Sequence, residues 1–339
     1  MTQYNVVVVG APGAVGQEIL KVLEERKFPV DQLKLCATSR SAGRQMVFRG
    51  SHYTVEETTA DSFTGMDLAL FAGGSASLEF APAAVERGCV VIDNSSNFRM
   101  DPAVPLVVPE VNPEDVKWHR GIIANPNCST IIMVVPLKPI YDQVGIRRVV
   151  VSTYQSASGA GMEAMEELIQ QTKAMSEGSE CIPRVFPYQL VFNLIPHIDV
   201  FQEMDYTKEE WKMVKETQKI LHDSCLAITA TAVRVPVLRS HSESVNVETV
   251  DKLTADRARE ILAKFPGVVV MDDPVQKEYP MPLFCSHRDE VFVGRIREDN
   301  SLPNGINLWV AADQLRKGAA TNAVQIAETV IEYSCLQRS

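Results

Sequence analysis

The sequence lacks the features that mark several common classes of protein. Its 339 residues contain no CxxC pair, and the seven cysteines follow no regular interval, so neither a metal site nor a disulfide framework is predicted. No apolar run reaches the roughly 18 residues of a membrane span, and the N-terminal residues do not form a charged and then apolar signal segment. We therefore expect a cytoplasmic protein with no membrane partner.

An excess of basic charge is also missing. Lys and Arg total 33 against 43 Asp and Glu, which gives a net charge of -10 at pH 7. Nucleic-acid binders usually carry a basic surface, so no nucleic-acid partner is expected, and an anionic ligand would need a local cluster of basic groups. The hydrophobic share of 45% suits a full core, and at roughly 150 residues per domain the length suits two domains.

Strands and helices alternate over the first third of the chain. The run NVVVVG at 5–10 is continuous and β-branched, as in a strand buried on both faces, and residues 13–27 place apolar side chains at helical spacing. Four more short strands are predicted at 32–38, 66–73, 89–96 and 121–126. This alternation predicts a Rossmann-type, doubly wound α/β unit.

The pattern changes from about Val149. Longer strands with polar alternation are predicted at 147–158, 226–237 and 242–249, and helices near 162–175 and 207–223. Such strands suit a sheet with one face toward solvent or a partner. The last segment, 314–333, has helical spacing. We predict a first domain of residues 1–132, completed by a C-terminal helix within 315–339, and a second, α+β domain of residues 133–314.

Three glycines, Gly10, Gly13 and Gly16, stand in GAPGAVG between the first strand and the first helix. Glycines at this place let the backbone approach a pyrophosphate, whose charge the helix N-terminus favours. The alternative is a tight turn without a ligand. The position inside a βα repeat favours a bound dinucleotide.

The end of the second strand bears on the choice of dinucleotide. NAD binders usually carry an acid about 20 residues after the glycines, but this strand ends in CATSRSAGR. Ser39, Arg40 and Ser41 offer hydroxyls and a guanidinium where a carboxylate would repel a 2′-phosphate. The segment therefore favours NADP over NAD, unless Arg40 is simply a solvated loop charge.

The stretch IIANPNCSTI at 122–131 places Cys128 between a predicted strand and an apolar run. If that run opens a helix, the thiol lies at a helix N-terminus, where backbone N–H groups and the dipole favour a thiolate. Cys128 is then a nucleophile, or else an inert buried cysteine after an Asn-Pro-Asn turn. Candidate bases come from six histidines, at 52, 119, 197, 222, 241 and 287.

Six motifs, in order, resemble those of the aspartate-β-semialdehyde dehydrogenase family: NSSNFRMD, NPNCST, YQSASGAGMEAM, VFNLIPHID, TKEEWKMVKET and VRVPVLRSHSESV. The resemblance runs from the first glycine motif to AADQLRKGAATNAVQIAE. It implies a glyceraldehyde-3-phosphate-dehydrogenase-like architecture with an NADP-binding domain and a catalytic and dimerisation domain. It also implies a homodimer, in some members a tetramer.

The resemblance further implies an activity. The family reduces L-aspartyl-4-phosphate with NADPH and releases phosphate and L-aspartate-4-semialdehyde, a branch point for lysine, threonine, methionine and diaminopimelate. By this likeness Cys128 forms a thioester and His241 is the acid and base, with an unperturbed pKa close to working pH. The residues implied to contact substrate are Arg99, Asn127, Gln155, Glu209, Lys212 and Arg234.

Cofactor contacts are implied in both domains. They fall on Gly10, Pro12, Gly13, Ala14, Val15, Gly16, Ser39, Arg40, Ser41, Ser158, Gly159 and Gln314. Ser158 and Gly159 match the nicotinamide end. Pro12 departs from the family, where threonine is common, and because proline has no N–H one backbone contact to the pyrophosphate is lost.

Two other functions stay open at this point. One is a related acyl-phosphate reductase, such as N-acetyl-γ-glutamyl-phosphate reductase or a glyceraldehyde-3-phosphate-type enzyme. The other is a non-catalytic nucleotide-binding protein. Gln155 and the Glu209/Lys212 pair, three apart on one predicted helix face, favour a short amino-acid acyl phosphate. Charges are also expected there for another reason, because Thr207 to Glu210 forms a capping box.

Overall fold

A computed structural model describes residues 2–336 and divides the chain into two compact units. The first unit ends at Asn127 and resumes at Gly318, and the second runs Cys128–Lys317. The limits predicted from the sequence, after residues 132 and 314, lie a few residues from these ends. Cys128 therefore begins the second unit, whereas the sequence prediction put it near the end of the first.

A parallel sheet forms the centre of the first unit. In the described residues its strand order is β5-β2-β1-β6-β7-β8, and all neighbours pair in parallel. The Rossmann-type prediction is confirmed. The strands are β1 (Tyr4–Val9), β2 (Val30–Ala37), β5 (Glu56–Glu57), β6 (Leu68–Phe71), β7 (Val90–Asp93) and β8 (Ile122–Ala124), and a separate hairpin, which was not predicted, consists of β3 (Gln45–Phe48) and β4 (Ser51–Thr54).

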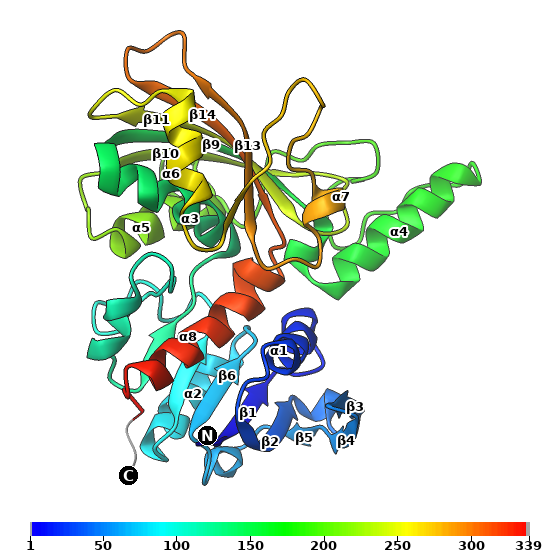
Figure 1. Cartoon of the computed structure of the whole chain (residues 1–339). Helices are drawn as coiled ribbons and strands as arrows, with labels where there is room; N and C mark the ends of the chain where they lie inside the picture. The colour runs from blue at the N-terminus through cyan, green and yellow to red at the C-terminus, as the bar shows by residue number, and fades with distance from the viewer. Residues whose placement is uncertain (1, 337–339) are drawn as a thin grey trace. The chain divides into compact units, whose positions relative to one another are not determined.

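Helices lie against both faces of this sheet. They are α1 (Ala14–Glu25), α2 (Ala76–Glu86) and α8 (Thr321–Glu332). Val6 and Val8 of β1 share a core with α1 and α8, whereas Val7 and Val9 share a second core with α2. Both faces of β1 are thus covered, which explains its unbroken β-branched run. Figure 1 shows α8, in red, beside the strands of the first unit although it lies about 200 residues further along the chain.

A mixed sheet forms the centre of the second unit. Its order in the described residues is β10-β9-β11-β14-β13-β12; β9 pairs in parallel with β10 and antiparallel with β11. The strands are β9 (Ile146–Gln155), β10 (Ala227–Arg234), β11 (His241–Thr249), β12 (Val268–Val270), β13 (Val291–Glu298) and β14 (Gly305–Ala312). The last three were not predicted. In β13 the register shifts between Gly294 and Arg297 and Arg295 has φ +51°, which interrupts the alternation.

Three helices of the second unit cover one face of the mixed sheet: α3 (Cys128–Val144), α5 (Lys208–Ile220) and α6 (Ala255–Ala263). The unit also contains α4 (Met162–Ser176) and α7 (Pro282–Cys285). The predicted capping box begins α5, since Thr207 and Glu210 exchange side-chain and backbone hydrogen bonds. Polar side chains on this covered face are shielded from solvent, so their hydrogen-bond partners must come from the protein.

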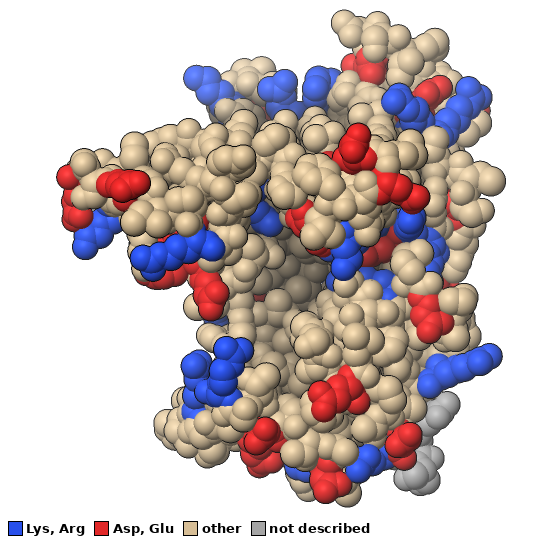
Figure 2. Space-filling model, turned by 180° about the vertical axis from the view of Figure 1, so that it is seen from behind, with Lys and Arg blue, Asp and Glu red and all other residues tan. Residues whose placement is uncertain are grey.

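Charge is dispersed over the surface rather than concentrated. On the face drawn in Figure 2, acidic and basic side chains are interspersed. Across residues 2–336 no helix has both the length and the apolar character needed to span a bilayer. No group of three or more His, Cys, Asp or Glu residues in that range is arranged to hold a metal ion.

Candidate active site

Cys128 is the first residue of α3, as the predicted strand, turn and helix require. Its side chain is half-buried, and α3 packs against β9, β11, β13 and β14. The first turn of α3 contains no acidic residue. The backbone N–H groups of this turn and the helix dipole therefore favour a thiolate at Cys128.

The other cysteines lie in different surroundings. Burial raises the pKa of Cys36, and it raises the pKa of Cys89 and of Cys285 to about 12. A thiol of such high pKa supplies little thiolate at neutral pH. These three behave as small apolar core residues. Cys181 and Cys335 are half-buried like Cys128, so Cys128 is distinguished by its place at a helix N-terminus.

Strand register brings three predicted site residues into one row of the mixed sheet. Gln155, the last residue of β9, pairs with Arg234, the last residue of β10. Ser242 of β11 pairs with Tyr154, so His241, the first residue of β11, lies beside Gln155 on its other side. Residues directly opposite on neighbouring strands point to the same face, and Arg234, Gln155 and His241 are 6%, 2% and 0% exposed.

Ser156 connects two members of this row. Its carbonyl oxygen accepts a hydrogen bond of 2.6 Å from Nη1 of Arg234, and its backbone N–H donates one of 3.1 Å to Nδ1 of His241. Arg234 and His241 also meet across Gly159, where a Cβ would lie 2.9 Å from Nη1 and 3.0 Å from Cε1 of the imidazole. Arg234 and His241, which the family resemblance implies as site residues, are therefore neighbours in the structure.

Burial controls the charge of both groups. It lowers the pKa of the Arg234 guanidinium, and the charges of Glu209 and Cys128 oppose that effect. Burial, followed by the positive charge of Arg234, lowers the pKa of His241 to about 3. Burial therefore moves the pKa of His241 below the unperturbed value on which its acid and base role was argued.

Glu209 joins the row to a charged cluster on α5. Its Oε1 accepts a bond of 3.1 Å from Nε2 of Gln155, and its Oε2 lies 3.0 Å from Nζ of Lys212. Lys212 also pairs with Asp199 at 2.9 Å. Burial acts to lower the pKa of Lys212, but Glu209 and Asp199 outweigh it and the pKa is raised. The lysine is therefore a fixed cation next to the row.

Three predicted cofactor residues of the second unit form one network with the row. Gln314 is 2% exposed. Its Oε1 accepts a bond of 2.9 Å from the backbone N–H of Ser240, and its Nε2 donates to Oγ of Ser158. The hydroxyls of Ser158 and Ser156 are 2.9 Å apart. Ser158, Gly159 and Gln314 thus lie around His241.

The glycine motif lies in the first unit, at the start of α1. Gly10 has φ +83°, which favours glycine. A Cβ on Gly16 would lie 2.3 Å from the carbonyl oxygen of Gly10, so only glycine permits this approach of helix and turn. Gly13 is the N-cap without a side-chain bond, and the first turn of α1 has no acid. The backbone N–H groups of the first turn of α1 can therefore bind an anion such as a pyrophosphate.

The remaining predicted residues also belong to the first unit. Ser39–Ser41 form a short 3-10 helix after β2, and Arg40 is exposed with no ion pair to any residue in 2–336. Arg99 is buried and donates to the carbonyl oxygens of Asn125 and Asn94 at 3.0 and 2.9 Å. Pro12, Ala14 and Val15 stand with the glycines, and Asn127 directly precedes Cys128.

Three residues near the row were missed by sequence reasoning: Ser156, Asp199 and Glu243. Glu243 is fully buried, and neither carboxyl oxygen has a hydrogen-bond partner among the described residues. Burial, and then the charge of Glu209, raise its pKa well above its usual range. In the sequence, the one indication that Glu243 belongs near the site was its position two residues after His241, which puts both side chains on the same face of β11.

Both units match domains of known protein families. Residues 5–119 match the NAD-binding domain of semialdehyde dehydrogenases, and residues 137–317 match their dimerisation domain.

Individual relatives agree over nearly the whole chain. The chain is similar to an aspartate-semialdehyde dehydrogenase of Aquifex aeolicus, with 59% identity over 335 residues, 97% of this chain and 98% of that protein. It is 52% identical to one of Bacillus subtilis over 96% of this chain and 97% of that protein. A crystal structure of aspartate semialdehyde dehydrogenase II from Vibrio cholerae, complexed with ASA, matches with a TM-score of 0.95 and 48% identity, over 98% of this chain and 99% of that chain.

The buried carboxyl of Glu243 predicts a pH-dependent gain from Glu243→Gln. Because burial raises the pKa of the folded carboxyl, the folded protein binds a proton that the unfolded chain has lost, so stability is lost as pH rises from the unfolded pKa of about 4.3 toward the folded pKa. Glutamine is neutral in both states. Urea unfolding should show equal stability at pH 4 and a more stable variant at pH 8, with a gain of about 1.4 kcal/mol per pH unit between the two pKa values.

Glu163→Gln, at an exposed carboxyl on α4, is the matched control and should show no such gain. A Glu243→Gln variant that is less stable than the parent at pH 8 would contradict the neutral, unpartnered carboxyl.

Proposed function

The chain belongs to the aspartate-semialdehyde dehydrogenase family, and on this premise we propose that Cys128 carries the reaction as a covalent thioester. The enzyme converts L-aspartyl-4-phosphate to L-aspartate-4-semialdehyde and phosphate in the aspartate pathway, on the route to lysine, threonine, methionine and diaminopimelate. One observation carries the proposal: the half-buried thiol at the N-terminus of α3 interacts electrostatically with Arg234 of the buried row.

The first chemical step is a substitution at the acyl carbon. The sulfur of Cys128 attacks the carbon, a C–S bond forms, and the C–O bond to phosphate breaks with its electron pair on the phosphate. Covalent catalysis divides one hard substitution into two easier steps. Gln155, held by Glu209 at 3.1 Å, orients the acyl group, and His241 lies beside it in the row.

The charged residues hold the two ends of the substrate. One N–H of Arg234 is bonded to Ser156, and the rest of its planar fork suits the α-carboxylate. Glu209 meets the substrate ammonium. Lys212, kept cationic by two carboxylates, binds the phosphate together with Arg99, and Asn127 is a further substrate contact.

We assign the first unit to the binding of a nicotinamide dinucleotide, with NADP as its ligand. The uncapped first turn of α1 suits the pyrophosphate, and exposed Arg40 between two serines suits a 2′-phosphate. The nicotinamide end of the cofactor is contacted by Ser158, Gly159 and Gln314. When bound, the cofactor supplies the hydride that reduces the thioester.

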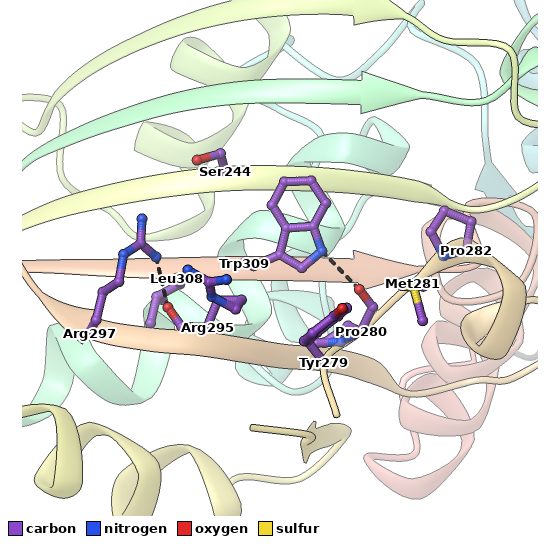
Figure 3. Close-up of a pocket in the computed structure, with 9 residues that line it drawn as sticks. All are labelled: Ser244, Tyr279, Pro280, Met281, Pro282, Arg295, Arg297, Leu308 and Trp309. Carbon is purple, nitrogen blue, oxygen red and sulfur yellow. Dashed lines mark hydrogen bonds between the residues drawn. The ribbon is translucent and has the colours of Figure 1, made fainter. Parts of the chain in front are cut away.

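The second unit, Cys128–Lys317, is assigned to catalysis and to homodimer formation. The sheet face opposite α3, α5 and α6 carries a pocket of about 320 Å³, and the match to a dimerisation domain supports a second copy of the chain as its occupant. Figure 3 shows Trp309 in this pocket, with its indole N–H bonded to the carbonyl oxygen of Pro280 at 2.9 Å. Ser244 of β11 lies at the same pocket.

The location assigned to the enzyme is the cytoplasm. Thiols stay reduced in the cytoplasm, where disulfides are rare. The seven free thiols of the chain are in keeping with such a compartment.

Replacement of the nucleophile tests the function. Cys128→Ala should lower turnover by roughly 10⁴-fold or more, since the thioester route is lost, whereas NADPH affinity should stay unchanged because the cofactor is held by other groups. The assay is reduction of NADP⁺ with aspartate semialdehyde and phosphate, run beside the N-acetylglutamate analogue.

Cys225→Ala, at an exposed cysteine outside the site, is the matched control and should be fully active. Activity of Cys128→Ala within tenfold of wild type, or a preference of the wild type for the acetylated analogue, would refute the assignment.

Removal of the guanidinium after β2 tests the cofactor. Arg40→Ala should weaken NADPH binding by about 10- to 150-fold, since a charge-assisted hydrogen bond is worth roughly 1.5 to 3 kcal/mol. NADH, which has no 2′-phosphate, should bind as before. Fluorescence titration with both cofactors measures the difference, and an equal loss for the two would place Arg40 outside the site.

A bulky charge at the pocket face tests the dimer. Ser244→Arg should convert the protein to a monomer at micromolar concentration, because an unpaired guanidinium would be buried in the interface. Light scattering measures the molar mass, and Ser51→Arg, on an exposed strand of the first unit, should remain dimeric. If Ser244→Arg keeps the mass of the wild type, the interface lies elsewhere.

A further inference from the structure

Asp313 directly follows β14 and is completely buried. Its Oδ2 accepts hydrogen bonds of 2.6 Å from Nε of Arg239 and from the backbone N–H of His287. Its Oδ1 accepts from the backbone N–H groups of Leu315 and Arg316 at 2.9 and 3.3 Å. A carboxylate offers about four acceptor positions. Four donors of the protein itself occupy them, so this side chain does not serve as a ligand of substrate or cofactor.

The bonds of this carboxylate join three segments of the second unit. They are 237–241, which leads into β11, 286–287, which precedes β13, and 313–316, which follows β14. The first and third segments meet again beside it, because the backbone N–H of Ser240 donates to Oε1 of Gln314 at 2.9 Å. The carboxylate therefore lies where the ends of three neighbouring strands of the sheet are connected.

Two of the joined segments have backbone conformations that need support. Ser240 has φ +75° and His287 has φ +67°, a region that residues other than glycine seldom adopt. Ser240 is fully buried, and its hydroxyl lies 2.8 Å from that of Ser286. Such conformations persist only where surrounding contacts hold them. The backbone N–H of His287 is held directly by Asp313.

The same segments carry groups of the candidate active site. Nε2 of Gln314 donates to the hydroxyl of Ser158. The backbone N–H of Ser158 in turn donates to the carbonyl oxygen of Leu238 at 3.1 Å. His241 is the last residue of the first segment. Both polar groups of Ser158, and the start of β11, thus depend on segments that Asp313 joins.

We propose that Asp313 is a positioning residue for hydride transfer, since its carboxylate fixes the nicotinamide contacts Gln314 and Ser158 relative to His241. The inference rests on the proposed function, in which Ser158 and Gln314 contact the nicotinamide end of the cofactor. Asp313 acts only through the segments that it joins. Hydride transfer depends on such support, because a displacement of about 1 Å can lower a rate about 10²-fold.

Replacement by asparagine keeps the size of the side chain but exchanges one acceptor oxygen for an NH₂ donor. If the NH₂ group faces Arg239 and His287, both lose their acceptor and the guanidinium loses its counter-ion. If it faces Leu315 and Arg316, those two backbone N–H groups meet another donor. In either orientation of the amide, one of the two sets of bonds is lost.

Rapid mixing measures the rate at which NADPH forms in the first turnover from aspartate semialdehyde, phosphate and NADP⁺. Asp313→Asn should lower this rate by about 10- to 10²-fold and change the KM for aspartate semialdehyde by less than about threefold, because the assigned substrate contacts lie in other segments. Deuterium at the aldehyde carbon should slow the first turnover of the variant, which identifies hydride transfer as the affected step. A sample that has only lost folded protein would show a smaller amplitude at an unchanged rate.

Asp272→Asn is the matched control. The Asp272 side chain is also buried, and its Oδ2 accepts from Nε of Arg259 at 2.9 Å and from the backbone N–H of Ile296 at 3.3 Å. These partners lie on α6 and in β13, outside the three segments, so the first-turnover rate should equal that of the wild type. Arg239→Met is a second variant, which leaves three backbone donors on Asp313 and should slow the first turnover by about tenfold. It decides the question if Asp313→Asn does not fold.

Hydrogen exchange measures the same support without turnover. In the protein without substrates, Asp313→Asn should raise the exchange rates of the backbone amides in 237–241 and 313–316 by about tenfold or more, whereas Asp272→Asn should leave them unchanged. Wild-type exchange in these segments would overturn the proposal, and so would a wild-type first-turnover rate, or one insensitive to deuterium, in the folded variants. If the wild-type protein does not oxidise aspartate semialdehyde, the proposed function fails and the role in hydride transfer fails with it, but the exchange rates still show whether Asp313 joins the segments.

Discussion

The register of the mixed sheet is the constraint on which the site depends. Because β9 pairs with β10 in parallel and with β11 antiparallel, the ends of two strands and the start of a third meet in one row. That row consists of Arg234, Gln155 and His241. Each strand alone carries one functional group, and only the pairing makes them neighbours. The positions of these three residues are set by the backbone hydrogen bonds of the sheet.

Burial gives this row its chemistry. Arg234 is nearly enclosed, yet the negative charges of Glu209 and Cys128 oppose the effect of burial on it. Glu209 is in turn balanced by Lys212, and Lys212 by Asp199. Removing water strengthens each of these interactions, so the row and the α5 cluster form one coupled system. The same exclusion of water raises the pKa of Glu243, whose carboxyl oxygens have no hydrogen-bond partner among the described residues.

The sequence predicted those features that depend on local pattern. The parallel sheet, the glycine turn and the place of Cys128 at a helix start follow from apolar runs and turn residues close together in the chain. The roles of Ser156 and Asp199 could not be predicted, because they arise from contacts with residues further along the chain. Ser156 contacts His241, 85 residues later, and Asp199 contacts Lys212, 13 residues later. The pKa of His241 could not be predicted either, since burial on all sides is a property of packing.

The alternation of side chains between the two faces of β11 limits the insertions and deletions that this strand can accept. His241, Glu243 and Val245 are buried toward α3, whereas Ser244 lies at the pocket of the opposite face. A single-residue insertion or deletion within the strand would exchange the two sets and expose the histidine side while burying serines. A single-residue indel in β11 therefore damages both faces at once, and catalytic and assembly surfaces must evolve in step along this strand.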